Sequence, residues 1–257
     1  VLMEAGADVN AGEGWGAQTA LMWAAAQSQP DMVAFLIEKG ADADARSTVR
    51  DWQRKATAEP RPMEMQLGGS TALLYAARQG CVDCARHLIA AGADPDLADP
   101  ENVTPLVLAL ENLHFDFAAY MISAGADVNK WDVRARSPIY MAADMSTLPE
   151  SFRHDLPSTD TATGADVARL LLEAGANPNL QLKRKPPYRE RVMDRGGDMI
   201  LHVGATPLLR AAKAADVEVV KLLLEHGALI DLPNAYGVTP FLAAAGYGNN
   251  DRSTRGL

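Results

Sequence analysis

Two cysteines three positions apart, Cys81 and Cys84, are followed by His87, and this spacing could hold a metal ion or a redox-active pair. A structural zinc ion ordinarily needs four ligands, however, and the chain has no second cysteine pair. A redox C-x-x-C motif is expected beside a strand–helix–strand unit, and no such pattern surrounds these residues. We therefore expect neither a metal nor a redox role, and we predict that Cys84 is a small buried hydrophobic residue.

The other polar residues form no recognisable catalytic pattern. The five histidines are scattered, none belongs to an H-E-x-x-H motif, and no G-x-S-x-G motif occurs. The GEGWG segment at 12–16 is not a phosphate-binding G-x-G-x-x-G motif. Most carboxylates fall in turns, where Asp and Asn bond to nearby backbone groups. The sequence therefore predicts a protein that is not an enzyme and needs no cofactor.

Composition excludes several other classes. The chain has 257 residues, of which 48% are hydrophobic, so wholesale disorder is excluded. Its formal net charge of −9 disfavours general nucleic-acid binding, because phosphates would be repelled. No apolar run approaches the roughly 18 to 20 residues that span a bilayer, so we expect no membrane insertion.

A short segment repeats along the chain and predicts where helices begin. In each copy a Thr or Ser, often followed by Pro, precedes an apolar run rich in Leu and Ala. Thr and Ser are good N-cap residues, and Pro suits the first helical position. The copies are TALMWAA from Thr19, TALLYAA from Thr71, TPLVLAL from Thr104, SPIYMAA from Ser137, TPLLRAA from Thr206 and TPFLAAA from Thr239.

A second repeated segment predicts where a partner helix ends. Each copy has an apolar stripe at helical spacing, then a Gly that suits the left-handed end of a helix, then an Asp- or Asn-containing turn. A unit of this size cannot bury its own stripe, so the units must stack. The closing glycines are Gly6, Gly40, Gly92, Gly125, Gly175 and Gly227.

These two segments resemble the T-P-L-H-x-A and G-A-D-x-N motifs of the ankyrin repeat, in six copies of which two are partial. The resemblance implies an all-α solenoid of stacked helix–turn–helix units with finger loops, forming a single domain over 1–257, and a role in protein binding. Long fingers of this kind also resemble ankyrin-repeat proteins of environmental bacteria. The family's usual His is absent, and its positions hold Met22, Leu74, Val107, Tyr140, Leu209 and Leu242.

The spacing of the motifs predicts three insertions, at about 45–67, 145–164 and 181–203. Two intervals from a closing Gly to the next helix start, Gly40 to Thr71 and Gly175 to Thr206, are 31 residues long instead of 12. Both insertions fall in a finger, so we expect two long arms. The insertion at 145–164 falls between two helices of one unit, and its Ser, Thr, Asp and Pro content predicts an irregular surface loop.

The two arms are basic, although the chain as a whole is acidic. Segment 45–61 has a balance of +3 and segment 183–195 a balance of +4, which leaves −16 for the rest of the chain. The arms could grip an acidic partner, or they could fold back on the acidic scaffold and stabilise it. The candidate binding residues in the arms are Trp52, Arg54, Lys55, Lys183, Arg184, Lys185 and Tyr188.

Further candidates come from the family pattern, because the x of T-P-L-H-x-A usually points into the ankyrin groove. An aromatic groove suits protein recognition, since Trp, Tyr and Arg account for most binding hot spots. Packing beneath the first arm is the alternative for Trp23 and Tyr75. Near finger tips, Trp15 and Trp131 are similar candidates. The groove candidates are Trp23, Tyr75, Met141 and Arg210, with Leu108 and Ala243 at the same position.

We therefore expect a monomeric, non-enzymatic scaffold that binds a protein or peptide through the groove and the basic arms. The alternatives are a spacer in a larger protein whose activity lies elsewhere, and nucleic-acid binding through the arms. The chain begins at Val1 in what reads as a helix end and stops in loop-like sequence, so we expect the natural protein to extend further. The sparse cysteines fit a cytoplasmic or an exported, periplasmic protein.

Overall fold

The computed structural model describes residues 1–51, 67–147, 160–186 and 200–247. These residues form eleven α-helices and no strand beyond two isolated bridges, which confirms the expected all-α class. The chain divides into two compact units, Val1–Ala126 and Asp127–Leu257. The expectation of one domain over 1–257 stays a prediction.

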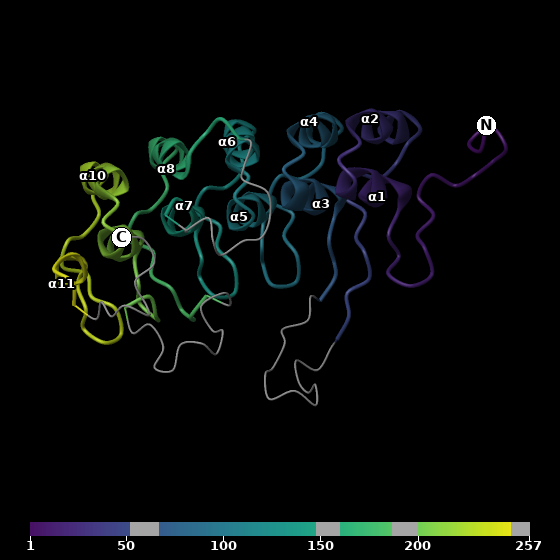
Figure 1. The fold of residues 1–257 in the computed structure, drawn as a ribbon. Coiled ribbons are helices and arrows are strands. Elements are labelled where there is room, and N and C mark those ends of the chain that lie inside the picture. Colours follow the sequence, from purple (N-terminus) through teal and green to yellow (C-terminus); the bar gives the residue numbers. More distant parts are fainter. Residues whose placement is uncertain (52–66, 148–159, 187–199, 248–257) are drawn as a thin grey trace. The chain divides into compact units, whose positions relative to one another are not determined.

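Unit 1 consists of three helix pairs stacked in two rows. Helices α1, α3 and α5 pack against one another in an inner row beside the fingers, and α2, α4 and α6 form an outer row (Figure 1). Each inner helix also packs against the outer helix that follows it. The helices are α1 (Ala20–Ala26), α2 (Pro30–Glu38), α3 (Ala72–Gln79), α4 (Val82–Ala90), α5 (Pro105–Glu111) and α6 (Phe115–Ser123).

Unit 2 repeats this arrangement. Its inner row is α7, α9 and α11, and its outer row is α8 and α10. The third insertion lies between α7 and α8, as its spacing indicates, although residues 148–159 lie outside the described part of the chain. The helices are α7 (Pro138–Met145), α8 (Gly164–Glu173), α9 (Pro207–Lys213), α10 (Val217–Glu225) and α11 (Pro240–Ala244).

The repeated Thr and Ser residues are the N-caps of all six inner helices, as the motif predicts. Each side-chain oxygen accepts a hydrogen bond from the backbone N–H three residues later, at distances from 3.0 to 3.4 Å. One otherwise unpaired donor is thus satisfied at each helix start. The caps are Thr19, Thr71, Thr104, Ser137, Thr206 and Thr239.

The six closing glycines all have positive φ angles, from +84° to +91°. A Cβ atom built on any of them would meet no atom within 4 Å. Glycine is therefore required for its backbone conformation and not for space, which agrees with a left-handed helix terminus.

Asparagine side chains join consecutive units at the base of the fingers. Asn10 donates from Nδ2 to the Gly40 carbonyl (3.2 Å), while its Oδ1 accepts from the Asp42 N–H (2.8 Å). Asn129 and Asn179 bridge to the following turns in the same way. Each of these amides therefore connects two repeats through both of its polar atoms.

Candidate functional site

The inner row of unit 1 presents a partly exposed aromatic surface. Trp23 on α1 is 51% exposed, and Tyr75 on α3 and Leu108 on α5 are half-buried. These residues hold the same position in consecutive copies of the motif, and α1 packs against α3 as α3 does against α5. The expected groove position is therefore accessible throughout this unit.

The finger preceding α1 is fixed by one carboxylate. Glu13 accepts hydrogen bonds from the backbone N–H groups of Trp15 (2.5 Å), Gly16 (2.6 Å) and Gln18 (3.3 Å). The Trp15 bond is the main reason why the pKa of Glu13 lies below its ordinary value. The Gln18 amide in turn donates to the Tyr75 hydroxyl, so the finger is connected to the aromatic surface. Trp15 is held at the tip with 78% of its surface exposed.

The first arm begins by docking on that finger. The Arg50 guanidinium lies 4.6 Å from the centre of the Trp15 ring and donates to the Trp15 carbonyl at 2.8 Å. The Thr48 N–H donates to the Gly16 carbonyl at 2.7 Å. Arg50 lies in the basic segment 45–61, but the sequence pattern does not distinguish it from the other cations there. The contact of a cation with a Trp face is favourable even at an exposed site.

The two limbs of the first arm pair as a short stem. The Arg50 N–H donates to the Leu67 carbonyl (2.7 Å), and Val49 and Gly68 form an isolated bridge. Gly68 has a φ of +77°, and a Cβ there would lie 2.1 Å from the Thr48 carbonyl oxygen. The candidates Trp52, Arg54 and Lys55 lie outside the described residues.

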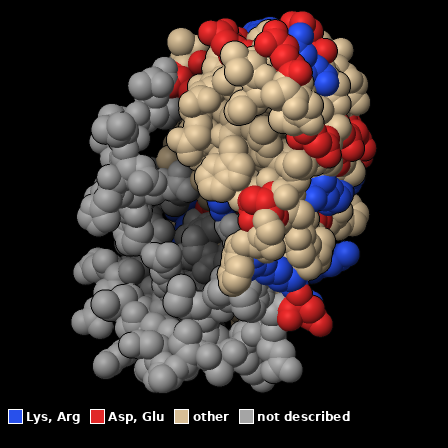
Figure 2. Space-filling view, turned by 90° about the vertical axis from the view of Figure 1, so that its right-hand side faces the viewer, with Lys and Arg blue, Asp and Glu red and all other residues tan. Residues whose placement is uncertain are grey.

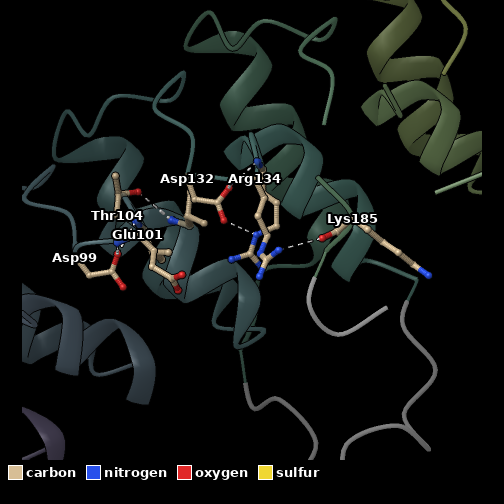
Figure 3. Close-up of polar contacts among 9 residues, drawn as sticks. Asp99, Glu101, Thr104, Asp132, Arg134 and Lys185 are labelled. Carbon is tan, nitrogen blue, oxygen red and sulfur yellow. Dashed lines mark hydrogen bonds and ion pairs between the residues drawn. The ribbon is translucent and has the colours of Figure 1, made fainter. Parts of the chain in front are cut away.

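The second arm begins in a similar way within unit 2. The Lys183 and Arg184 N–H groups donate to the Arg134 carbonyl (2.9 and 3.3 Å), and the Arg134 guanidinium donates to the Lys185 carbonyl at 3.4 Å (Figure 3). The Lys183 ammonium lies 5.1 Å from the centre of the Trp131 ring, which is 37% exposed. Tyr188 lies outside the described residues.

A buried carboxylate holds the finger on which this arm docks. Asp132 Oδ1 accepts from the Arg134 and Arg136 N–H groups (2.9 and 2.8 Å), and its Oδ2 accepts from Arg136 Nε at 2.6 Å. In unit 1, Asp99 shapes its own finger by accepting from the Glu101 and Val103 N–H groups, both at 2.9 Å (Figure 3). Each arm thus begins against a preceding finger that one carboxylate holds, Glu13 in unit 1 and Asp132 in unit 2.

The inner row of unit 2 differs from that of unit 1. Met141 and Arg210, expected in the groove, are buried at 0% and 2% exposure, and Ala243 is buried too. The Arg210 guanidinium forms an ion pair with the buried Asp144 carboxylate, which joins α9 to α7. Arg210 therefore acts within the fold, and neither it nor Met141 offers a free surface to a partner.

The cysteine prediction needs correction as well. Cys84 is fully buried, as expected, but it is not a free hydrophobic residue because its sulfur is bonded to that of Cys81. Cys81 lies at the start of α4, where both sulfurs can approach, with a Cα–Cα distance of 5.3 Å. In the part of the chain that the structure describes, no group of three or more His, Cys, Asp or Glu residues could hold a metal ion.

Comparison with known families agrees with these repeats. A profile of three ankyrin repeats matches residues 54–132 and 162–252, and a single-repeat profile matches residues 18–48. The chain belongs to the ankyrin-repeat family. Ankyrin repeats generally serve as protein-interaction scaffolds, so the coarse functional expectation agrees with the family.

Two vertebrate proteins are among the relatives of this ankyrin-repeat chain. The chain is 34% identical over 242 residues to a protein of Homo sapiens named Palmitoyltransferase ZDHHC13. It is 30% identical over 241 residues to the putative palmitoyltransferase ZDHHC13 of Danio rerio. Each match covers 93% of this chain but only 30% and 29% of the relatives. The activity in their names is therefore not carried over, and these relatives give no support to the bacterial resemblance.

Among the described residues of the ankyrin repeats, no helix is long and apolar enough to cross a membrane. On the face of the molecule in Figure 2, acidic and basic side chains are interspersed, with broad uncharged areas between them. Uncharged side chains are therefore available for contact beside the charged groups.

Proposed function

We propose that this ankyrin-repeat chain is a non-enzymatic scaffold that binds a protein or peptide segment on the inner-helix row of unit 1. The exposure of Trp23 beside Tyr75 and Leu108 carries the proposal. Large aromatic side chains provide much contact area with few rotatable bonds, and Trp and Tyr are enriched among binding hot spots. The surface also stands on packed helices, so little conformational entropy is lost when a partner binds.

The partner segment that fits best contains carboxylates next to apolar residues. Within unit 1, Arg50 places a cation on the exposed Trp15 ring. Unit 2 has a separate pair of the same kind, Lys183 on Trp131. Lys183 and Arg184 are exposed as well. The sequence candidates Trp52, Arg54 and Lys55 remain proposed contacts for such a segment in unit 1, and Lys185 and Tyr188 remain separate candidates in unit 2.

The test compares variants that differ by one aromatic or apolar side chain. Trp23→Ala removes the proposed anchor, and Met32→Ala removes a comparably exposed side chain from α2 in the outer row. Affinity purification with the two variants and the parent chain should recover a protein that the parent and Met32→Ala retain and Trp23→Ala loses. With that protein purified, calorimetry should give a Kd raised about 30-fold for Trp23→Ala, as expected for a hot spot.

The same experiment separates the alternatives. Identical recovery by all three chains would reject the proposed surface and favour a spacer role. A nucleic-acid role would appear as a mobility shift that weakens steeply with added salt and depends on Lys183 and Arg184.

A further inference from the structure

The bond between Cys81 and Cys84 lies at the N-terminus of α4, in the outer row of unit 1. Cys81 is the N-cap residue, and its sulfur accepts a hydrogen bond from the Cys84 N–H at 3.3 Å. Cys81 is half-buried, whereas Cys84 has no exposed surface. The two sulfurs therefore differ in accessibility, and Cys81 is the one that a reagent from solvent can reach.

Other copies of the repeat build the same turn without a covalent bond. Helices α6 and α10 begin after the N-cap residues His114 and Asp216, and they place Phe117 and Val219 three residues later. Both of these later residues are fully buried, as Cys84 is. In α10 the Asp216 carboxylate accepts from the Val219 N–H at 3.1 Å, the same role that the Cys81 sulfur has in α4. The repeat therefore folds without a disulfide at this position.

The disulfide also closes a very short loop. Its two cysteines are separated by three positions, so it removes little conformational freedom from the unfolded chain. Stabilisation of the fold is consequently a weak explanation for the bond. A thiolate at the start of a nine-residue helix, by contrast, is favoured by the unpaired N–H groups and the helix dipole.

We propose that Cys81 and Cys84 are a redox-active thiol–disulfide pair that exchanges with a dithiol partner. One thiolate of the dithiol attacks Cys81 Sγ and forms a mixed disulfide, while the bond to Cys84 breaks and Cys84 leaves as a thiolate that takes up a proton. The second thiol of the partner loses its proton and attacks the partner sulfur of the mixed disulfide, which releases Cys81. Two electrons pass to the cysteine pair, and the dithiol becomes a disulfide.

Reduction leaves the helix intact, because the reduced Cys84 occupies a position that suits a buried apolar side chain. To test this, the native chain is incubated with dithiothreitol and its free thiols are counted by alkylation and mass spectrometry. The proposal expects two thiols to appear without denaturant, circular dichroism to stay unchanged, and oxidised dithiothreitol to restore the bond. Reduction that occurs only when denaturant unfolds the chain would overturn it.

Single variants separate the two sulfurs. In Cys84→Ser the remaining Cys81 thiol should react with iodoacetamide at least about tenfold faster than the Cys84 thiol that remains in Cys81→Ser. Equal rates in the two variants would contradict the assignment of Cys81 as the exchanging sulfur.

A matched double variant checks that the bond is dispensable for folding. Cys81→Asp with Cys84→Val copies the pair that starts α10, and its Tm should stay close to that of the oxidised chain. A large fall in Tm would give the disulfide a structural role and overturn the proposal.

Discussion

At the scale of single residues, the turn between repeats depends on whether one position holds Asn or Asp. Asn10, Asn129 and Asn179 donate to a glycine carbonyl and accept from a backbone N–H of the next turn. Asp44 occupies the same position but only accepts, from the Asp94 N–H at 3.1 Å. A carboxylate has no hydrogen to donate at neutral pH, so this turn lacks one of the two bonds.

We therefore predict that Asp44→Asn stabilises unit 1. The new amide should donate to the Gly92 carbonyl, and the net gain of one hydrogen bond is about 0.5–1.5 kcal/mol. Urea unfolding measures the change in the free energy of unfolding. Asn179→Asp is the reverse exchange in unit 2 and should be destabilising, so a shift of the same sign in both variants would refute the argument.

The residues that the sequence predicted well act locally. The N-cap Thr19 and the closing Gly40 perform their roles through backbone groups within a few positions, so their types and spacing are sufficient. The exposed Trp23 was found from the repeat position, which fixes the helix face. Burial of Arg210 could not be found in this way, because it depends on Asp144, 66 positions away on a different helix.

At the scale of elements, the buried ion pair between Asp144 and Arg210 joins α7 to α9. It predicts that single and double variants differ strongly in the free energy of unfolding. Asp144→Asn leaves the Arg210 charge buried without its counter-ion, which costs about 3–5 kcal/mol. Replacing both residues, with Asp144→Leu and Arg210→Met, removes both charges and should be nearly neutral or stabilising. Urea unfolding of the three chains tests this, and equal losses in the single and double variants would contradict it.

The stem of the first arm depends on a glycine at a close approach. Gly68→Ala places a Cβ against the Thr48 carbonyl oxygen and strains a residue whose φ is +77°. We expect a loss of about 1–3 kcal/mol in the free energy of unfolding, measured by thermal unfolding. Gly14→Ala is the matched control in the same unit, because a Cβ there would meet no atom within 4 Å. Its effect should stay within about 0.5 kcal/mol.

The stem of the first arm includes contacts that the sequence does not predict. Motif spacing locates both finger insertions, but it does not specify how the two limbs of an arm pair with each other. The contact of Arg50 with Trp15 joins residues 35 positions apart, and no repeat motif specifies it. The disulfide was missed for a different reason. Its cysteines are only three positions apart, but a C-x-x-C motif predicts a redox pair beside a strand–helix–strand unit, and no such unit surrounds it.

At the scale of the whole molecule, the basic arms and the acidic remainder of the chain allow Tm to change with salt in either of two opposite directions. If arm cations pair with scaffold carboxylates, added salt screens attraction and lowers Tm. If they are available to a partner, salt chiefly screens the repulsion within a chain of net charge −9 and raises Tm. The exposure of Arg184, whose backbone docks on Arg134 while its side chain faces solvent, favours the second response.

We therefore predict that Arg184→Gln with Lys185→Gln changes the free energy of unfolding by less than about 0.5 kcal/mol. Arg184 is exposed and Lys185 is only partly buried, and charges at such sites contribute little to stability. Thermal unfolding of the variant and the parent chain, each between 20 mM and about 500 mM salt, provides the measurement, with the Debye length falling from tens of ångströms to a few. A Tm that rises with salt in both chains supports arms that serve a partner. A Tm that falls with salt in the parent chain alone would show that these cations stabilise the acidic scaffold instead.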